Sequence, residues 1–219
     1  RNLGSVDFEE SFKIQKQIQN EIIDIKLNNR KNNLNLPTPN YLLFMEHNHV
    51  YTLGNSGDDK NLLFNEKELD KKGIKFIKTN RGGDITYHGP GQLVCYPIFD
   101  LENFYTDIHR YLRDLEEIIV GTLDHFGIVA FGNPNETGVW LDIGSKNERK
   151  ICAMGIKVSR WVTMHGLALN VNTDLSYFEG IIPCGIKDKG ISNLTKIKNQ
   201  DYSKLKDLLV EKFISNLKN

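Results

Sequence analysis

Two stretches of the sequence carry side chains that could do chemistry. The first, RGGDITYHGPG at residues 81–91, places four glycines between or beside Arg81 and His88. Glycine permits backbone conformations that are closed to other residues and lets a ligand approach the main chain, and the arginine and histidine add hydrogen-bond donors. The stretch could bind a ligand, or it could be a tight surface turn with a hydrogen-bonded histidine, and these residues alone leave both interpretations open.

The second stretch is IIPCGIKD, residues 181–188, which holds one of the three cysteines. Cys184 lies between a proline and a glycine, with little bulk beside it, so its thiol is accessible and could be a nucleophile if its pKa is lowered. A loop cysteine without a function is the alternative. Cys95 and Cys152 lie inside apolar runs typical of strands, where a cysteine is usually a small buried hydrophobe.

Familiar binding signatures are absent from the sequence. It contains no Walker A loop, no dinucleotide fingerprint after a strand, no Cys-x-x-Cys pair and no His-Glu-x-x-His motif. Phosphate binding by the 81–91 stretch therefore has weak support, and no metal site is indicated. His165, in TMHGLALN, is a further candidate, although a single histidine is more often structural.

Charge and composition limit the class of protein. Lys and Arg together number 28, as do Asp and Glu, so the formal net charge is zero over 219 residues. This balance argues against nucleic acid or an anionic membrane as the main partner. No apolar run approaches the roughly 18 residues of a membrane span, and the first residues lack the apolar stretch of a signal peptide. Because the cysteines do not suggest a disulfide framework, we expect a cytoplasmic globular protein.

Hydrophobic periodicity predicts three principal helices and a set of short strands. A capping box of Asp7 and Glu10 starts the first helix, which we expect to end at about Leu27, before an Asn-rich loop. The other helices are expected at residues 106–126, with a glycine as the stop, and at about 203–217. The expected strands are residues 41–47, 49–54, 74–79, 92–101, 128–132, 137–142, 150–159 and 165–172.

The order of these elements indicates the fold class. Strands outnumber helices, and neighbouring strands are often separated by hairpin-like spacings. These features predict an α+β fold with a mixed to largely antiparallel sheet flanked by helices. Without an internal repeat or a convincing boundary, residues 1–219 are expected to form a single domain. Residues 174–194 are expected to be mostly turn and loop.

The glycine-rich stretch and the apolar run after it, RGGDITYHGPGQLVCYPI, closely resemble the signature of the lipoyl(octanoyl) transferase family. Three further segments resemble that family in its own order, namely EHNHVYTLG, RKICAMGIKVSRWVTMHGLALNVNTDL and IIPCGI. Together they extend from about Tyr41 to Leu194, which is most of the chain. On these four segments the chain is identified as a member of the family. The resemblance implies a fold similar to the catalytic domain of biotin and lipoate protein ligases.

The resemblance also implies roles for individual residues. Cys184 matches the acyl-accepting nucleophile, and Lys150, which composition alone would make a surface charge beside Arg149, matches the lysine that activates it. Asn48 and His49 stand where relatives often have prolines, a difference expected to alter a loop only. The implied substrate-binding residues are Arg81, Gly82, Gly83, Asp84, Ile85, Thr86, Tyr87 and His88 of the glycine-rich loop, and Ala153, Met154, Gly155, Gly166, Leu167 and Ala168 of the acyl pocket.

The activity implied by the resemblance is transfer of an octanoyl group from acyl-carrier protein to the Nε of a lysine on lipoyl domains, in lipoate biosynthesis. The donor is carried on phosphopantetheine, and the acceptors are lipoyl domains of 2-oxoacid dehydrogenase complexes and the glycine cleavage H protein. The Cys184 thiolate, favoured by the Lys150 ammonium, takes the acyl group as a thioester. Neutral Lys150 then accepts a proton from the amine. Neither ATP nor a metal is implied.

Three alternatives stay open at this point. An ATP-dependent lipoate or biotin ligase would form an acyl-adenylate on the same type of fold and would need no cysteine, so Cys184 and Lys150 argue against it. An amidotransferase that moves octanoyl between lipoyl domains would use a similar cysteine, and the choice of donor depends on surfaces that the sequence does not reveal. A catalytically inactive carrier-binding protein is disfavoured by the intact pair of residues.

Overall fold

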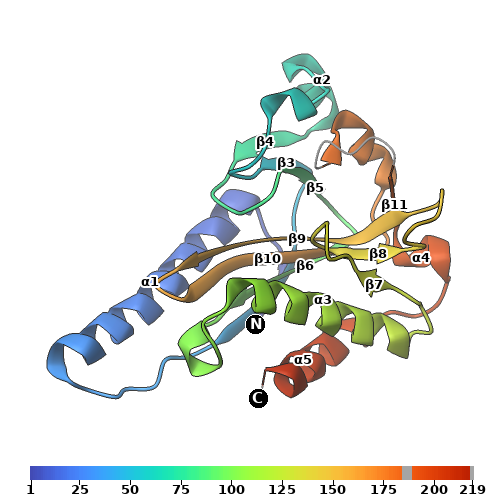
Figure 1. Cartoon of the computed structure of the whole chain (residues 1–219). Helices are drawn as coiled ribbons and strands as arrows, with labels where there is room; N and C mark the ends of the chain where they lie inside the picture. The colour runs from blue at the N-terminus through green and yellow to red at the C-terminus, as the bar shows by residue number, and fades with distance from the viewer. Residues whose placement is uncertain (184–188, 218–219) are drawn as a thin grey trace.

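A computed structural model describes residues 1–183 and 189–217, and its largest feature is a mixed β-sheet (Figure 1). Within the described residues this sheet has eight strands in the order β1-β2-β6-β10-β9-β8-β7, with β11 paired to β9. Neighbouring strands are antiparallel except β1 with β2 and β11 with β9. The strands are β1 (Asn2–Ser5), β2 (Tyr41–Glu46), β6 (Gln92–Ile98), β7 (Phe131–Gly132), β8 (Val139–Leu141), β9 (Arg149–Ser159), β10 (Val162–Asn170) and β11 (Gly190–Ile191).

A second, smaller sheet lies on one side of the large sheet (Figure 1). Its order is β4-β3-β5, with β3 parallel to β4 and antiparallel to β5. Leu69, from the short helix α2, packs with Tyr51 of β3 in a separate apolar cluster beneath this sheet. The elements of this part are β3 (Val50–Leu53), α2 (Glu66–Lys72), β4 (Lys75–Lys78) and β5 (Ile85–His88).

Helices cover both faces of the large sheet (Figure 1). Helix α1 packs on strands β6 and β10 from one side, whereas α3 and α5 pack together on the other side. No helix in the described part of the chain has the length and apolar character to cross a bilayer. The helices are α1 (Phe8–Asn32), α3 (Ile108–His125), α4 (Leu194–Ile197) and α5 (Leu205–Asn216), with short 3-10 helices at η1 (Asp59–Asn61), η2 (Leu101–Asn103) and η3 (Leu175–Gly180).

The side chains of β6 point alternately to the two faces of the sheet, so this one strand contributes to the apolar core on both sides. Val94 and Tyr96 pack with the apolar side chains of α1, whereas Leu93 and Cys95 join the larger cluster under α3 and α5. Successive side chains of a strand point to opposite faces, so a continuous apolar run such as 93–98 is the pattern of a strand that is buried on both sides. The core therefore has two layers, divided by the sheet.

The predicted α+β class and the mixed, mostly antiparallel sheet are confirmed. The first helix is longer than predicted, because its polar end continues to Asn32, where Asn33 adopts a left-handed φ of 51° and its N–H bonds to the Asn29 carbonyl as a C-cap. A second sheet was not predicted. It separates the runs 41–47 and 49–54, which form strands of different sheets.

Candidate active site

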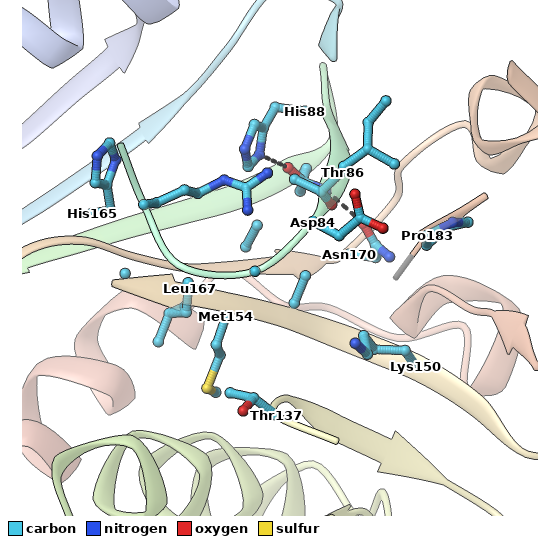
Figure 2. Close-up of a pocket in the computed structure, with 18 of the residues that line it drawn as sticks. Asp84, Thr86, His88, Thr137, Lys150, Met154, His165, Leu167, Asn170 and Pro183 are labelled. Carbon is cyan, nitrogen blue, oxygen red and sulfur yellow. Dashed lines mark hydrogen bonds between the residues drawn. The ribbon is translucent and has the colours of Figure 1, made fainter. Parts of the chain in front are cut away.

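A cavity of about 340 Å³ lies between β5 with its preceding loop and the strands β9 and β10 (Figure 2). Its lining comes from segments that are far apart in the sequence, including residues 81–88, 135–137, 150–155 and 165–170. Of the substrate-binding residues expected from the resemblance, all except Gly82 and Tyr87 line this cavity. The fold thus brings the two predicted groups of binding residues together around one space.

Small residues on β9 and β10 form the floor of the cavity. Gly155 pairs with Gly166, and Ala153 pairs with Ala168. Alternation along the two strands places these four residues on one face of the sheet. Because no side chain longer than a methyl group rises from these positions, the sheet leaves a flat apolar surface on which an acyl chain could lie.

The glycine-rich loop forms the wall opposite the floor and touches it directly. Gly82 N donates to Ile156 O at 2.8 Å. A Cβ at Gly155 would lie 2.7 Å from Gly82 O, so glycine at that position allows the close approach. The buried Arg81 guanidinium donates to Thr52 O at 2.5 Å and to Thr52 Oγ1 at 2.9 Å. These bonds hold a permanent cation at the edge of the cavity.

Tyr87 supports this wall from behind rather than lining the cavity. Its hydroxyl lies 2.7 Å from His49 Nδ1, and its ring stacks on Tyr177 with 5.2 Å between centroids. His49 also stacks on Tyr177, with 4.1 Å between centroids. The ring of His49 is therefore part of the packing behind the glycine-rich segment.

A chain of hydrogen bonds fixes the imidazole of His88 (Figure 2). Asn170 Nδ2 donates to the Ser192 carbonyl oxygen at 3.1 Å, so its Oδ1 accepts from Gln92 Nε2 at 2.9 Å. Gln92 Oε1 must then accept from His88 Nδ1, at 2.8 Å, which leaves Nε2 as an acceptor. Burial, followed by the nearby His47, lowers the pKa of His88 well below its ordinary value of 6.5. This histidine is therefore neutral at pH 7.

His165 lies at the side of the cavity away from Lys150 (Figure 2). Its Nε2 is 2.8 Å from Asn80 Oδ1, and its backbone has an unusual positive φ of 61°. Burial, with a further contribution from Arg81, lowers the pKa of His165 to about 3. A single histidine is more often structural, as the sequence suggested, but this one also lines the cavity.

Lys150 is the predicted activating residue, and it is not a surface charge. The side chain lines the cavity, the residue is only 8% exposed, and Nζ lies 4.5 Å from the centroid of the Trp140 ring. A bulge pairs Val139 with Cys152 and the next residue, Trp140, with Lys150. Gly138 has a φ of 127°, and a Cβ there would lie 3.3 Å from Lys150 Cε, so glycine leaves room for the lysine side chain.

The predicted nucleophile, Cys184, lies outside the described residues. Pro183, immediately before it, lines the cavity together with Lys150 (Figure 2). Cys95 and Cys152 are fully buried, as expected, and burial raises the pKa of each thiol well above its ordinary value. Neither of these two cysteines offers an accessible thiolate at neutral pH.

Comparison with known proteins identifies the family. Residues 11–216 match the family model described as the Lipoyl protein ligase A/B catalytic domain. A relative named Octanoyltransferase from Flavobacterium johnsoniae is 59% identical over 89% of this chain and 84% of its own length. Another of that name, from Cytophaga hutchinsonii, is 49% identical over 96% of this chain and 88% of its own length. The chain belongs to this family, among its octanoyltransferases.

Solved structures with the same fold include ligases. A bi-partite lipoate protein ligase from Thermoplasma acidophilum has a TM-score of 0.72 at 18% identity, over 99% of this chain and 82% of that chain. A lipoate-protein ligase A bound with ATP has a TM-score of 0.70 at 18% identity, over 99% and 85%. A biotin protein ligase from Aquifex aeolicus has a TM-score of 0.55, at 16% identity over 100% and 69%. The octanoyltransferase therefore has the ligase-like fold that the resemblance implied.

Several lining residues of this octanoyltransferase were not anticipated. Gln92 had the clearest signal, since it is a polar residue at the start of a strongly apolar strand, directly after the glycine-rich loop. The described residues contain no cluster of His, Cys, Asp and Glu side chains suited to a metal ion. The unanticipated lining residues are Phe8, Gln92, Tyr96, Asn135, Glu136, Thr137, Asn170, Phe178, Pro183 and Ile191.

Proposed function

We propose that this octanoyltransferase moves an octanoyl group from acyl-carrier protein to the Nε of a lysine on a lipoyl domain, with Cys184 as nucleophile and Lys150 as the residue that activates it. The acyl donor is a thioester on the carrier protein's phosphopantetheine. The acceptors are lipoyl domains of 2-oxoacid dehydrogenase complexes and the glycine cleavage H protein. Residues 1–219 act as one catalytic domain, and the reaction uses neither ATP nor a metal.

One observation carries the proposal, namely that an apolar floor and a buried lysine share one cavity with the residue before Cys184. The floor of Ala153, Gly155, Gly166 and Ala168 suits a saturated acyl chain, because burying each methylene contributes roughly 0.8 kcal/mol. Lys150 and Pro183 both line the same cavity. The acyl chain can therefore lie on the sheet while its carbonyl carbon lies near Lys150 and Pro183.

The chemistry follows from the two side chains. A free cysteine has a pKa of about 8.5, so only a few per cent is thiolate at pH 7, and a nearby ammonium at Lys150 favours the thiolate. In the first half reaction the Cys184 thiolate attacks the donor thioester, a new thioester forms, and the carrier sulfur leaves as a thiol with the proton of the Lys150 ammonium, which leaves Lys150 neutral. In the second, the acceptor amine attacks that thioester, Lys150 in its neutral form takes the amine proton, and the Cys184 sulfur leaves.

An ATP-dependent ligase is the second candidate. The buried Arg81 guanidinium at the edge of the cavity favours it, since a fixed cation beside an acyl site could contact a phosphate. Exchange of pyrophosphate into ATP that depends on lipoate or octanoate would support the ligase. Formation of octanoylated lipoyl domain from octanoyl-carrier protein without ATP supports the transferase. Substituting an octanoylated lipoyl domain as donor distinguishes the amidotransferase.

The nucleophile is tested by mass spectrometry of the protein after incubation with octanoyl-carrier protein. We expect one octanoyl group on Cys184, and none after Cys184→Ser, which should leave the thermal unfolding temperature unchanged. Cys152→Ala is the matched control, because it removes a fully buried cysteine without an accessible thiolate, and it should retain the label. An adduct on Cys95 or Cys152, or no adduct under single-turnover conditions, would contradict the assignment.

The role of Lys150 is tested by two substitutions. Lys150→Met should raise the pKa of the Cys184 thiol, seen as an upward shift in the midpoint of iodoacetamide alkylation against pH. Lys150→Arg should keep part of this effect, since it keeps a cation, but should block amide formation because arginine does not deprotonate. If both variants leave the alkylation midpoint and the rate of amide formation unchanged, Lys150 has no part in the reaction.

A further inference from the structure

A group of charged side chains surrounds the ring of Trp140. Lys189 Nζ lies 2.5 Å from Glu136 Oε1, 2.6 Å from Glu148 Oε1 and 4.9 Å from the centroid of the Trp140 ring. Trp140 Nε1 donates to the Glu136 carbonyl oxygen at 3.0 Å. We refer to these four residues as the Lys189 cluster. It joins the chain at position 189 to the segment before β8, to β8 itself and to the residue before β9.

The Lys189 cluster is continuous with the candidate active site. Lys150 Nζ lies 4.5 Å from the centroid of the same Trp140 ring that Lys189 contacts. Glu136 also lines the cavity. Because the ring contacts both ammonium groups, a change in the position of Lys189 or Glu136 acts on the surroundings of Lys150.

Backbone bonds tie the chain after Lys189 to the strand that carries Lys150. Gly190 N donates to the Glu148 carbonyl oxygen at 3.0 Å, and β11 then pairs in parallel with β9. Ser192 N donates to the Lys150 carbonyl oxygen at 3.0 Å. The side-chain bonds of Lys189 therefore extend this attachment by one residue toward Cys184.

The Lys189 cluster orders the chain locally more than it adds to the free energy of folding. Its side chains are partly exposed, at 24% for Lys189, 25% for Glu136 and 11% for Glu148, and exposed ion pairs contribute little to folding. The hydrogen bond from Lys189 lowers the pKa of Glu148, and the bonds to both carboxylates raise the pKa of Lys189. Both groups stay ionised through the neutral pH range, so the contacts persist there.

We propose that Lys189 is a positioning residue for acyl transfer, because its ion pairs with Glu136 and Glu148 fix the chain five residues after Cys184 against the strand that carries Lys150. The inference rests on the proposed function, in which Cys184 and Lys150 act together. Lys189 acts through the placement of this segment and not on the reacting atoms. Reaction rates depend steeply on the geometry between reacting groups, so loosening the attachment lowers the rate of acylation more than the affinity for the donor.

The test removes the charge of Lys189 with Lys189→Met and uses Lys67→Met, on the exposed surface of α2, as the matched control. Acylation of Cys184 by octanoyl-carrier protein is followed in single turnovers by mass spectrometry. We expect Lys189→Met to lower the maximal acylation rate about tenfold at an unchanged half-saturating donor concentration. Lys189→Arg should restore most of the rate, because it keeps a cation able to bridge two carboxylates. Lys67→Met should match the unsubstituted protein.

Each outcome is informative. A full acylation rate in Lys189→Met, an equal loss in Lys67→Met, or a loss that Lys189→Arg does not restore would overturn the inference. If Lys189→Met lowers the thermal unfolding temperature strongly, Glu136→Gln and Glu148→Gln replace it, and each is expected to give a smaller loss of rate. Full rates in both would also overturn the inference. If the unsubstituted protein takes no octanoyl group on Cys184, the proposed function fails instead.

Discussion

The two walls of the cavity differ in what holds them in place. The sheet wall, formed by β9 and β10, is a continuous backbone ladder of eight consecutive residue pairs. The loop wall, residues 81–88, combines four residue pairs between β5 and β3 and single backbone bonds of its loop with bonds from its side chains. The Arg81 guanidinium donates to Thr52, and Asp84 Oδ2 accepts from Asn61 Nδ2 at 2.5 Å.

Because of this difference, the sheet wall determines the shape of the cavity and the loop wall determines its polar contacts. A backbone ladder forms with almost any side chains, so the sheet wall sets the shape of the cavity through the small size of its residues. The loop wall carries the polar groups that face the cavity, and each depends on a few specific hydrogen bonds. Substitutions in the sheet wall should therefore act through volume, and those in the loop wall through lost bonds.

The largest effect is expected from Gly166→Ala in the sheet wall. A Cβ at this position would lie 2.3 Å from Cys95 O and 2.5 Å from Pro97 Cδ, both in the adjacent strand β6. Neither atom can move without shifting a strand that is buried on both faces. We expect the free energy of unfolding to fall by about 3 kcal/mol, measured by urea denaturation followed by circular dichroism.

Gly82→Ala in the loop wall is the matched control for that measurement. A Cβ there would meet Ile156 O at 3.4 Å, which is an ordinary contact. Its free energy of unfolding should change by less than about 1 kcal/mol, as is usual away from tight packing. Equal losses in the two variants would contradict the view that volume governs only the sheet wall.

The second effect concerns activity. Ala153 faces the cavity from the sheet wall, so Ala153→Leu should fill the space of the acyl chain while leaving the ladder intact. We expect the rate of octanoyl transfer to fall about a hundredfold, equivalent to roughly 2.7 kcal/mol of barrier. Transfer of a butyryl group should fall less, because the shorter chain leaves room for the leucine. An unchanged ratio of octanoyl to butyryl rates would show that the chain lies elsewhere.

Much of the sheet wall could be predicted from the sequence. The run 93–98 of the neighbouring strand β6 is strongly apolar, and the segments 150–159 and 165–172 alternate in size, so strands and buried faces follow from local pattern. The family resemblance then supplied the small residues of the acyl pocket. What it could not supply is the bulge that places Trp140 opposite Lys150, because a bulge depends on register between strands and not on one strand's own residues.

Less of the loop wall could be predicted, because its contacts join residues that are distant in sequence. Gln92 and Asn170 are 78 positions apart, and His49 meets Tyr87 across 38. Such pairs leave no periodic signal in a single sequence. Tyr87 was grouped with the binding residues because the family resemblance covers residues 81–88 as one loop, yet its ring packs behind the loop wall against His49 and Tyr177.

The third effect tests those distant bonds. Gln92→Leu removes the acceptor for His88 Nδ1–H and the donor to Asn170 Oδ1. Leaving buried polar groups unsatisfied destabilises a protein by about 1–3 kcal/mol, so we expect a loss near 2 kcal/mol in urea denaturation. The ¹⁵N spectrum of the imidazole should also change from a single Nδ1–H tautomer to a mixture. If the imidazole keeps its single tautomer in Gln92→Leu, the hydrogen-bond chain is not what fixes that tautomer.

The smallest effect is a pH dependence of stability that involves His165. Its folded pKa, about 3, is far below the ordinary value of 6.5, mainly because of burial and then Arg81. The unfolded chain therefore binds the proton first as the pH falls. The stability associated with the neutral imidazole is fully present above pH 6.5 and is lost progressively between pH 6.5 and 3. Between pH 7.5 and 5.5 this group should lower the free energy of unfolding by about 1.4 kcal/mol.

His165→Asn isolates this contribution, because asparagine tolerates the positive φ at this position and does not titrate. The free energy of unfolding, measured in urea at pH 7.5 and 5.5, should fall by about 1.4 kcal/mol less in the variant than in the unsubstituted protein. His88 stays in both proteins and titrates in the same direction, since its pKa is also lowered mainly by burial, so a pH dependence should persist in the variant. Equal losses in the two proteins would mean that His165 takes up its proton in the folded state as readily as in the unfolded chain.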